Sequence, residues 1–390
     1  MSTLNLTISS KLPNVKTTIF QTMSGIAQQS KAINLGQGFP DFACAPELIQ
    51  AVHEAMVAGH NQYPPMTGVG ALRQAISDKV FRLYSAAYDA EKEITVTAGA
   101  TQALLTTILA TVREGDEVIV LEPAYDSYIP SIELAGGIAI RVPMQYDAEQ
   151  SKFYYDWDLV KKAINHRTRL LMINSPHNPT GVCLAAAELE ILANIVRDTQ
   201  VLILSDEVYE HMVYDGAQHH SLAAHPELKQ RTFIVSSFGK TYHVTGWKIG
   251  YVLAPAEFMV EFRKVHQFNV FTANSAMQVG FASYMQDPTP YLQLPSFYQA
   301  KRDYFRSGLV DTGFKLLSSE GSYFQCVDYS SLSSKTELEF ATWLCQEIGV
   351  AAIPVSAFYK EGKEQNLVRF CFAKSTETLD LALQKLKRLA

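Results

Sequence analysis

The sequence lacks a close cysteine pair, a block of like charge and a long apolar run. Its five cysteines are scattered over 390 residues without a CxxC motif, which predicts reduced thiols rather than a disulfide framework, and we predict no metal site. The net charge of −6 comes from 33 basic and 39 acidic residues and shows no basic face. A nucleic-acid partner is therefore not expected.

Membrane and export signals are also missing. No apolar run approaches the roughly 18 residues that a membrane-spanning helix needs. The start, Met1–Ser10, intersperses Leu4, Leu6 and Ile8 among polar residues, so no signal peptide is predicted. With the reduced thiols, this favours a soluble cytoplasmic protein without a membrane partner.

The middle of the chain alternates short, continuously apolar strands with helices. Such strands are typical of a mostly parallel sheet that helices cover on both faces, as in an α/β fold. The expected strands are 93–97, 117–121, 138–142, 169–174, 201–204, 232–236 and 249–254, with helices at 101–112 and 185–197.

This pattern changes near residue 290, where a long helix is expected over 291–309, disturbed near its start by Pro290 and Pro295. Alternating strands and two helices follow, which is an α+β layout. The length of 390 residues also exceeds what one small core absorbs, so two domains are predicted. We place a large domain at 46–290 and a small domain at 1–45 plus 291–390. The later strands are expected at 324–327, 350–353 and 367–372.

Polar and glycine-rich residues gather where the apolar strands end. Because ligands bind beyond the carboxyl ends of the strands in open α/β sheets, each such cluster is a candidate part of one site. Gly99, Ala100 and Thr101 stand between a strand and a helix, where small side chains let backbone N–H groups approach an anion. An ordinary capping turn is the alternative.

Three charged residues stand in unusual places. Lys240 follows a strand within a glycine and hydroxyl loop, where a lysine can form an imine with an aldehyde, although most lysines are surface charges. Asp206 ends an apolar strand, so it either caps a helix or meets a partner such as a protonated ring nitrogen. Arg369 lies inside an apolar strand and needs an anion, either a bidentate substrate carboxylate or an internal salt bridge.

Two loops add further candidates. Asn178 lies in 174–181, whose two X-Pro steps favour a rigid, extended loop that can hold its amide toward a ligand oxygen. Tyr125 follows another strand and either stacks on a planar ring or packs in the core.

In order and spacing, these motifs resemble the fold-type I, class I and II aminotransferases that use pyridoxal 5′-phosphate. The methionine and the kynurenine/glutamine aminotransferases are the most similar groups. The resemblance runs from Asn34–Asp41 to Arg369–Phe372. It implies a fold-type I transferase, with a mostly parallel sheet between helices and a smaller α+β domain. It also implies pyridoxal phosphate as cofactor and small-molecule amino acids and 2-oxo acids as substrates.

The resemblance assigns roles to single residues. Lys240 matches the Schiff-base lysine that also moves the proton, Asp206 the partner of the pyridine nitrogen, and Tyr125 the stacking aromatic. The phenolic oxygen of the cofactor would be held by Tyr209 and Asn178. The phosphate cup would be formed by Gly99, Ala100, Thr101, Ser237 and Lys248. The family often has arginine in place of Lys248, and a lysine supplies charge without a bidentate fork.

Substrate contacts follow in the same way. Arg369 and the backbone of Gly38 match the α-carboxylate site. Tyr63 matches a tyrosine that reaches the phosphate of the neighbouring subunit, which implies a homodimer with shared active sites. The residues expected to line an apolar substrate pocket, unless some are core, are Phe20, Phe39, Tyr63, Tyr125 and Phe358.

This pocket favours methionine, phenylalanine, tyrosine, kynurenine or glutamine over aspartate, because no second arginine stands out for an acidic side chain. The resemblance makes methionine the first choice. A pyridoxal-phosphate cysteine-conjugate β-lyase is the alternative, since it would share nearly every cofactor residue. A ligand-sensing regulator would need a DNA-binding module, for which the sequence leaves no room.

Overall fold

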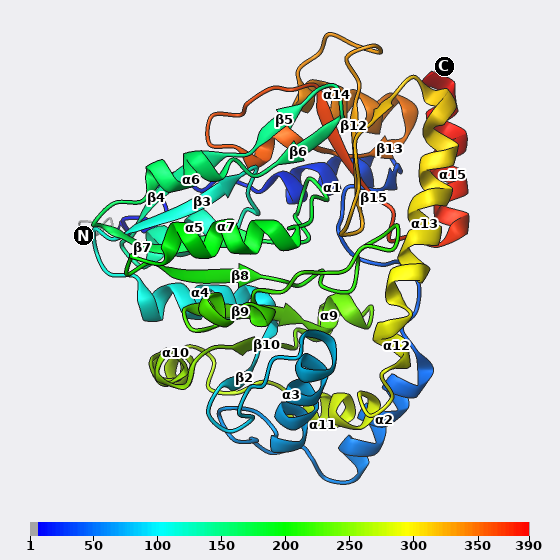
Figure 1. Cartoon of the computed structure of the whole chain (residues 1–390). Coiled ribbons are helices and arrows are strands. Elements are labelled where there is room, and N and C mark those ends of the chain that lie inside the picture. The colour runs from blue at the N-terminus through cyan, green and yellow to red at the C-terminus, as the bar shows by residue number, and fades with distance from the viewer. Residues whose placement is uncertain (1–6, 390) are drawn as a thin grey trace, which may run out of the picture.

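The centre of the molecule is a seven-stranded sheet, seen in a computed structural model that describes residues 7–389 (Figure 1). The strand order is β2-β10-β9-β8-β7-β3-β4, and β10 runs antiparallel to both of its neighbours while the other pairs are parallel. The predicted mostly parallel sheet is thus confirmed. Its strands are β2 (Ile94–Thr97), β3 (Glu117–Glu122), β4 (Ile138–Pro143), β7 (Thr168–Asn174), β8 (Leu202–Asp206), β9 (Thr232–Ser237) and β10 (Gly250–Leu253).

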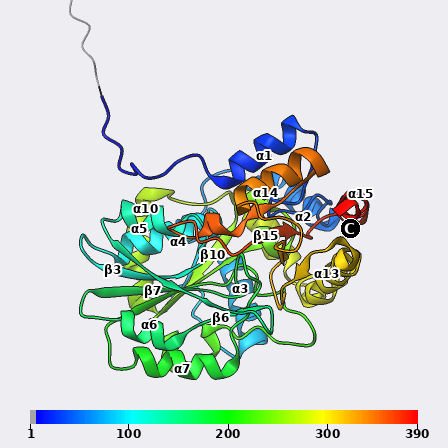
Figure 2. The ribbon, with the colours of Figure 1, turned by 90° about the horizontal axis from the view of Figure 1, so that it is seen from above.

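Helices cover both faces of this sheet, which explains why its inner strands are apolar throughout (Figure 2). One face carries α4 (Gly99–Thr111), α5 (Tyr128–Leu134) and α10 (Ala256–Asn269). The other carries α3 (Gly70–Tyr84), α6 (Trp157–Ala163), α7 (Ala186–Val196) and α8 (Pro226–Lys229). Two more helices pack against each other beside α3, namely α2 (Pro46–Val57) and α11 (Ser275–Tyr284).

A second sheet of four strands is formed by the later part of the chain, in the order β11-β12-β15-β14. Its strands are β11 (Lys315–Leu316), β12 (Phe324–Asp328), β14 (Ile353–Pro354) and β15 (Leu367–Cys371). The helices of this part are α12 (Thr289–Leu292), α13 (Leu294–Leu309), α14 (Glu337–Trp343) and α15 (Thr376–Leu386). The remaining elements are α1 (Ile19–Gln29), α9 (Phe238–Thr241) and the hairpin β5 (Gln145–Asp147) and β6 (Lys152–Tyr154).

One predicted strand is wrong in detail, and one predicted helix is broken near its start, as expected from its prolines. The single strand expected at 350–353 is two strands in two sheets, because the chain changes partner at Ala352. Val350–Ala351 (β13) pairs in parallel with Ile33–Asn34 (β1), whereas β14 pairs with β15. The helix expected over 291–309 is interrupted at Gln293, and α13 starts again with Pro295 in its first turn, where a missing N–H is tolerated.

The parallel pair of β1 and β13 brings the start of the chain to the later residues. The division into domains near residue 290 stays a prediction. All five cysteines are free thiols, as expected. Within residues 7–389 no helix is both long and apolar enough to cross a membrane. The first six residues of the start, in which no signal peptide is predicted, lie outside the described residues.

Candidate active site

A cavity of about 340 Å³ opens where the strands β7, β8 and β9 end. It contains all the predicted catalytic, cofactor and carboxylate-binding residues except Tyr63, together with part of the predicted aromatic pocket. They come from eight separate stretches of sequence, namely Phe20, Gly38, Gly99–Thr101, Tyr125, Asn178, Asp206 and Tyr209, Ser237 and Lys240 with Lys248, and Arg369.

The start of α4 forms an anion cradle at one end of this cavity. Gly99 has a φ of +78°, which glycine adopts freely, and an added Cβ would lie 3.3 Å from Lys248 Cε. The backbone therefore comes close to the Lys248 side chain. Together with Ala100, Thr101 and Ser237, these groups offer helix N-terminal N–H groups, hydroxyls and one cation, which suits a phosphate.

Lys240 projects from α9 into the cavity. Its Nζ donates to the Tyr323 hydroxyl at 2.7 Å and to the Gly38 carbonyl at 3.2 Å, and it forms no ion pair within residues 7–389. Burial lowers the pKa of Lys240 from 10.5 to about 8, although Cys371 and Asp206 oppose this shift. A sizeable fraction of the amine is consequently neutral, which is the form that attacks an aldehyde.

Asp206 lies at the end of β8 and is buried. Burial raises the pKa of its carboxyl to about 6, while a hydrogen bond from Tyr128 works in the opposite direction. The Tyr128 hydroxyl donates to Oδ2 at 2.7 Å, and the Val208 N–H donates to Oδ1 at 3.3 Å. The backbone carbonyl of Asp206 accepts from the Asn174 amide at 2.9 Å, which fixes the end of the strand.

Arg369 is 1% exposed and has no carboxylate partner within the described part of the chain. Its Nη1 donates to Asn178 Oδ1 at 2.6 Å and its Nη2 to the Gly36 carbonyl at 3.1 Å, but Nε lacks a partner there. The guanidinium lies over the Phe324 ring at 3.8 Å. The alternative of an internal salt bridge is therefore wrong, and the buried cation still calls for an anion.

The aromatic pocket is correct only in part. Phe20 and Tyr125 line the cavity, and Phe324 joins them. Phe358 is core instead, packed edge-on against Phe20 with ring centroids 5.9 Å apart. Phe39 is 44% exposed and outside the cavity lining.

Tyr63 lies apart from the cavity. Its side chain is 82% exposed and packs edge-on against Phe271, with ring centroids 5.3 Å apart. The two sit beside a second hollow that is lined by residues 56, 60–64 and 272–276. The predicted reach of Tyr63 into a neighbouring subunit stays a prediction.

Sequence reasoning missed several residues of the site. Tyr128 follows Tyr125 by three residues, and this helical spacing is the signal that could have placed its hydroxyl near Asp206. Phe324, which lines the cavity, and Tyr323, whose hydroxyl accepts from Lys240 Nζ, gave no signal in the sequence, because the second sheet brings them to the site. The other missed lining residues are Gln37, Leu104, Asp126, Asn174, Val208 and Thr245.

The donor set fits pyridoxal phosphate. The cradle at α4 suits its phosphate, Lys240 its aldehyde, and the buried Asp206 its ring nitrogen. The fold and this cavity together define a fold-type I, pyridoxal-phosphate-dependent enzyme. The chain belongs to the class I and II aminotransferase family, whose model matches residues 30–386. It is an aminotransferase, and its substrates are amino acids and 2-oxo acids.

Several relatives cover almost the whole chain. A methionine aminotransferase of Escherichia coli K12 is 47% identical over 381 residues, which span 97% of this chain and 98% of the relative. Kynurenine–oxoglutarate transaminase 1 of Rattus norvegicus is 33% identical over an alignment of 409 positions, gaps included, which covers 97% of this chain and 97% of the relative. The crystal structure of an Escherichia coli protein with a methionine aminotransferase function superposes with a TM-score of 0.95 at 46% identity, covering 98% of this chain and 100% of that one.

Proposed function

We propose that this aminotransferase takes the α-amino group from an apolar, aromatic or sulfur-containing amino acid, with methionine the preferred donor. The observation that carries the proposal is the small number of cations that line the cavity. Lys240, Lys248 and Arg369 are the cations among the described lining residues. Lys240 and Lys248 would hold the aldehyde and the phosphate of the cofactor, which leaves Arg369 for a substrate carboxylate. A second, acidic side chain would find no cation there, whereas Phe20 and Phe324 offer apolar contact.

Bound pyridoxal phosphate supplies an electron sink for the carbanion that forms when the α-proton leaves. Lys240 Nζ removes that proton and returns it, a role that its pKa of about 8 permits near neutral pH. Asp206 would hold the proton on the ring nitrogen. Tyr209 and the Asn178 amide nitrogen would donate to the phenolic oxygen, since Asn178 already uses its oxygen for Arg369.

The two substrates would enter the same cavity one after the other. The first amino acid leaves as a 2-oxo acid before the acceptor binds, because Arg369 holds one carboxylate at a time. We therefore propose ping-pong kinetics. Parallel lines in double-reciprocal plots would support the scheme, and intersecting lines would contradict it.

We also propose a homodimer with shared active sites. The contact between the exposed rings of Tyr63 and Phe271 beside a surface hollow supports this, since adjoining exposed apolar side chains, unlike single ones, mark interaction surfaces. Sedimentation equilibrium would give twice the chain mass. Mixing inactive Lys240→Ala chains with Tyr63→Phe chains would restore part of the activity if the sites are shared.

A half-reaction screen tests the donor. The enzyme is mixed with single amino acids, and the visible spectrum follows conversion of the cofactor from its aldehyde to its amine form. Methionine should convert it fastest and aspartate slowest; the reverse order would reject the proposal. Pyruvate and ammonia released from a cysteine conjugate without any 2-oxo acid would indicate a β-lyase, which the aminotransferase relatives do not favour.

A further inference from the structure

Three buried carboxylates stand within five residues at the end of β8. Asp206, Glu207 and Glu210 are each at most 5% exposed. Only Asp206 lines the cavity, together with Val208 and Tyr209. Glu207 and Glu210 therefore leave the same short turn in other directions, and the proposed reaction gives them no part.

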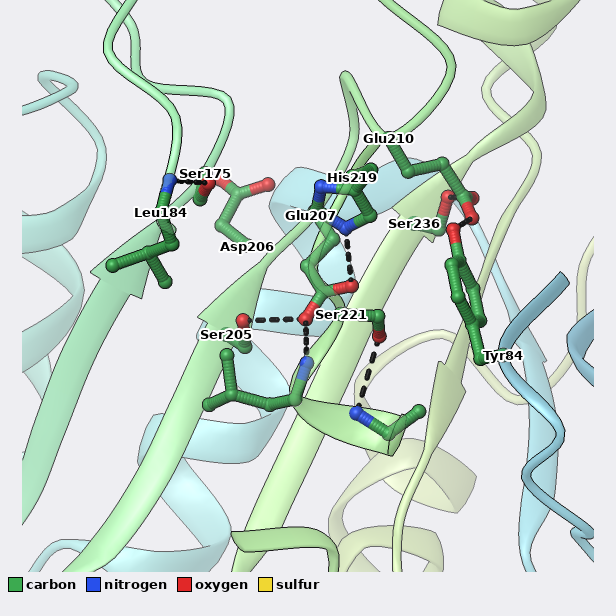
Figure 3. A network of polar contacts seen from close by, with 12 residues as sticks. Tyr84, Ser175, Leu184, Ser205, Asp206, Glu207, Glu210, His219, Ser221 and Ser236 are labelled. Carbon is green, nitrogen blue, oxygen red and sulfur yellow. Dashed lines mark hydrogen bonds and ion pairs between the residues drawn. The ribbon is translucent and has the colours of Figure 1, made fainter. Parts of the chain in front are cut away.

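Glu210 is held by four side chains from three elements. Figure 3 shows two of them, Tyr84 and Ser236. From α3, Lys79 Nζ donates to Oε1 at 2.6 Å and the Tyr84 hydroxyl to Oε2 at 2.6 Å. From β9 and β10, the hydroxyls of Ser236 and Tyr251 donate to Oε1 at 2.5 and 3.1 Å. Burial alone would raise the pKa of Glu210, but the Lys79 ammonium and these hydrogen bonds hold it well below its usual range.

Glu207 is anchored in the same way on the other side of the turn. It accepts from the Ser205 hydroxyl at 2.8 Å, from the Leu222 N–H at 3.2 Å and, at 2.9 Å, from His219 Nε2 (Figure 3). The two carboxylates flank Val208 and Tyr209 in the sequence. The turn that carries Tyr209 is thus fastened on both sides.

The partners of Glu210 sit next to other residues of the cavity. Ser236 and Tyr251 are directly opposite each other across β9 and β10. Ser236 precedes Ser237 and stands four residues before Lys240, while Tyr251 stands three residues after Lys248. One carboxylate therefore ties together the strand ends that present the Tyr209, Lys240 and phosphate sides of the cavity.

A buried ion pair is weak support for stability, because apolar residues of similar size are often as stable. The geometry points to another role: we propose that Glu210 and Lys79 are positioning residues, which set the distance between the Tyr209 hydroxyl and the Lys240 amine for cofactor binding. The proposal rests on the cofactor roles given above to Tyr209 and Lys240. Partners of this kind around metal ligands carry about 10- to 100-fold in affinity, and we expect the same order here.

The test uses the full-length apoprotein and measures equilibrium binding of pyridoxal phosphate. The variants are the single change Glu210→Gln and the double change Glu210→Gln with Lys79→Met. The double variant removes both charges of the pair, so it can replace the single variant if that one fails to fold. Both should bind the cofactor at least about tenfold more weakly. The matched control is Asp215→Asn, which removes the 2.6 Å partner of buried Arg302 outside the cavity and should change binding by less than about twofold while lowering the melting temperature.

A second readout needs no cofactor. Amide hydrogen exchange of the apoprotein at Tyr209 should be faster in the double variant than in wild type, and unchanged in Asp215→Asn. Wild-type cofactor affinity in the double variant, or unaltered exchange at Tyr209, would overturn the proposal. The variant Tyr209→Phe tests the cofactor role of Tyr209 separately from the positioning role of Glu210 and Lys79. If Tyr209→Phe leaves cofactor binding unchanged, the proposed cofactor role of Tyr209 is rejected, and the positioning role of the pair is not.

Discussion

Two pairs of cations, each consisting of a lysine and an arginine, can be compared in this molecule. Lys79 and Arg302, 2% and 6% exposed, each meet carboxylates within the chain: Lys79 meets Glu210 at 2.6 Å, and Arg302 meets Asp215 at 2.6 Å. Within residues 7–389, Lys240 and Arg369 donate only to neutral hydrogen-bond acceptors. Arg369 is 1% exposed, and Lys240, which lines the cavity, is half-buried. The two pairs differ in whether the chain itself supplies the counter-charge.

The missing counter-charge has a direct electrostatic effect. For Arg302, burial is outweighed by the hydrogen bonds that its guanidinium donates to Asp215 and Asp303, and the pKa is raised. For Arg369, burial prevails and the pKa is lowered. An enclosed cation without an anion is costly, and that cost falls when a ligand brings the negative charge. The chain itself thus supplies the counter-charge for Lys79 and Arg302. Lys240 and Arg369, which have no carboxylate partner within residues 7–389, are called the open cations below, and we propose that they bind the cofactor and the substrate.

Replacing the open lysine should have the largest effect. We expect Lys240→Ala and Lys240→Arg to abolish transamination and the visible absorbance of the lysine-bound cofactor, because neither side chain offers a primary amine of lowered pKa. Lys240→Arg is the sharper variant, since it keeps the positive charge. The control Lys264→Ala changes an exposed lysine paired with Glu261 and should behave as wild type. Residual turnover in both Lys240 variants would end the distinction between open and paired cations.

Replacing Arg369, the open arginine, should have the second-largest effect on activity. Arg369→Ala is expected to weaken transition-state binding of the amino acid by about 2–5 kcal/mol, or roughly 30- to 5000-fold in kcat/KM, because the α-carboxylate loses its partner. Stopped-flow measurement of the first half-reaction gives this value.

The variant Arg302→Ala tests the paired arginine, whose counter-charge the chain itself supplies. It should lower the free energy of unfolding and leave kcat/KM for the same amino acid unchanged. If the two arginine variants lose activity alike, charge compensation does not separate site from scaffold in this protein.

The sequence was sufficient for the parts of the site that follow strand ends. Asp206, Lys240 and Gly99 each come directly after an apolar strand, so the sheet topology brings them together, and the family resemblance supplied their order. The contacts of Tyr323 and Phe324 depend on how the second sheet packs against the first, which no local pattern encodes. Phe358 was misplaced for the same reason, since an aromatic side chain suits a pocket and a core equally well.

Removing the hydroxyl of Tyr128 should have a smaller effect on activity. Tyr128→Phe removes the 2.7 Å hydrogen bond to Asp206 Oδ2 and should lower kcat by roughly tenfold, since hydrogen bonds to charged groups are worth about 1.5–3 kcal/mol. The bond lowers the pKa of Asp206, so its loss should move the acid limb of the kcat profile to higher pH. The control is Tyr359→Phe, whose hydroxyl has no partner within residues 7–389. An acid limb at the wild-type position would contradict this role of Tyr128.

The smallest expected effect is the pH dependence with which Lys240, but not Lys79, captures the aldehyde of pyridoxal phosphate. Only the neutral amine captures an aldehyde, and the pKa of Lys240 is lowered to about 8 from 10.5. The rate at which the apoprotein captures pyridoxal phosphate should therefore rise with pH and level off above about 8, a few-fold change between pH 7 and 8. Borohydride trapping and peptide mass analysis should then find the label on Lys240 and none on Lys79, which Glu210 keeps paired. A rate that climbs steadily to pH 10 would mean that Lys240 titrates as an ordinary lysine, and its lack of a counter-charge would then not explain its reactivity.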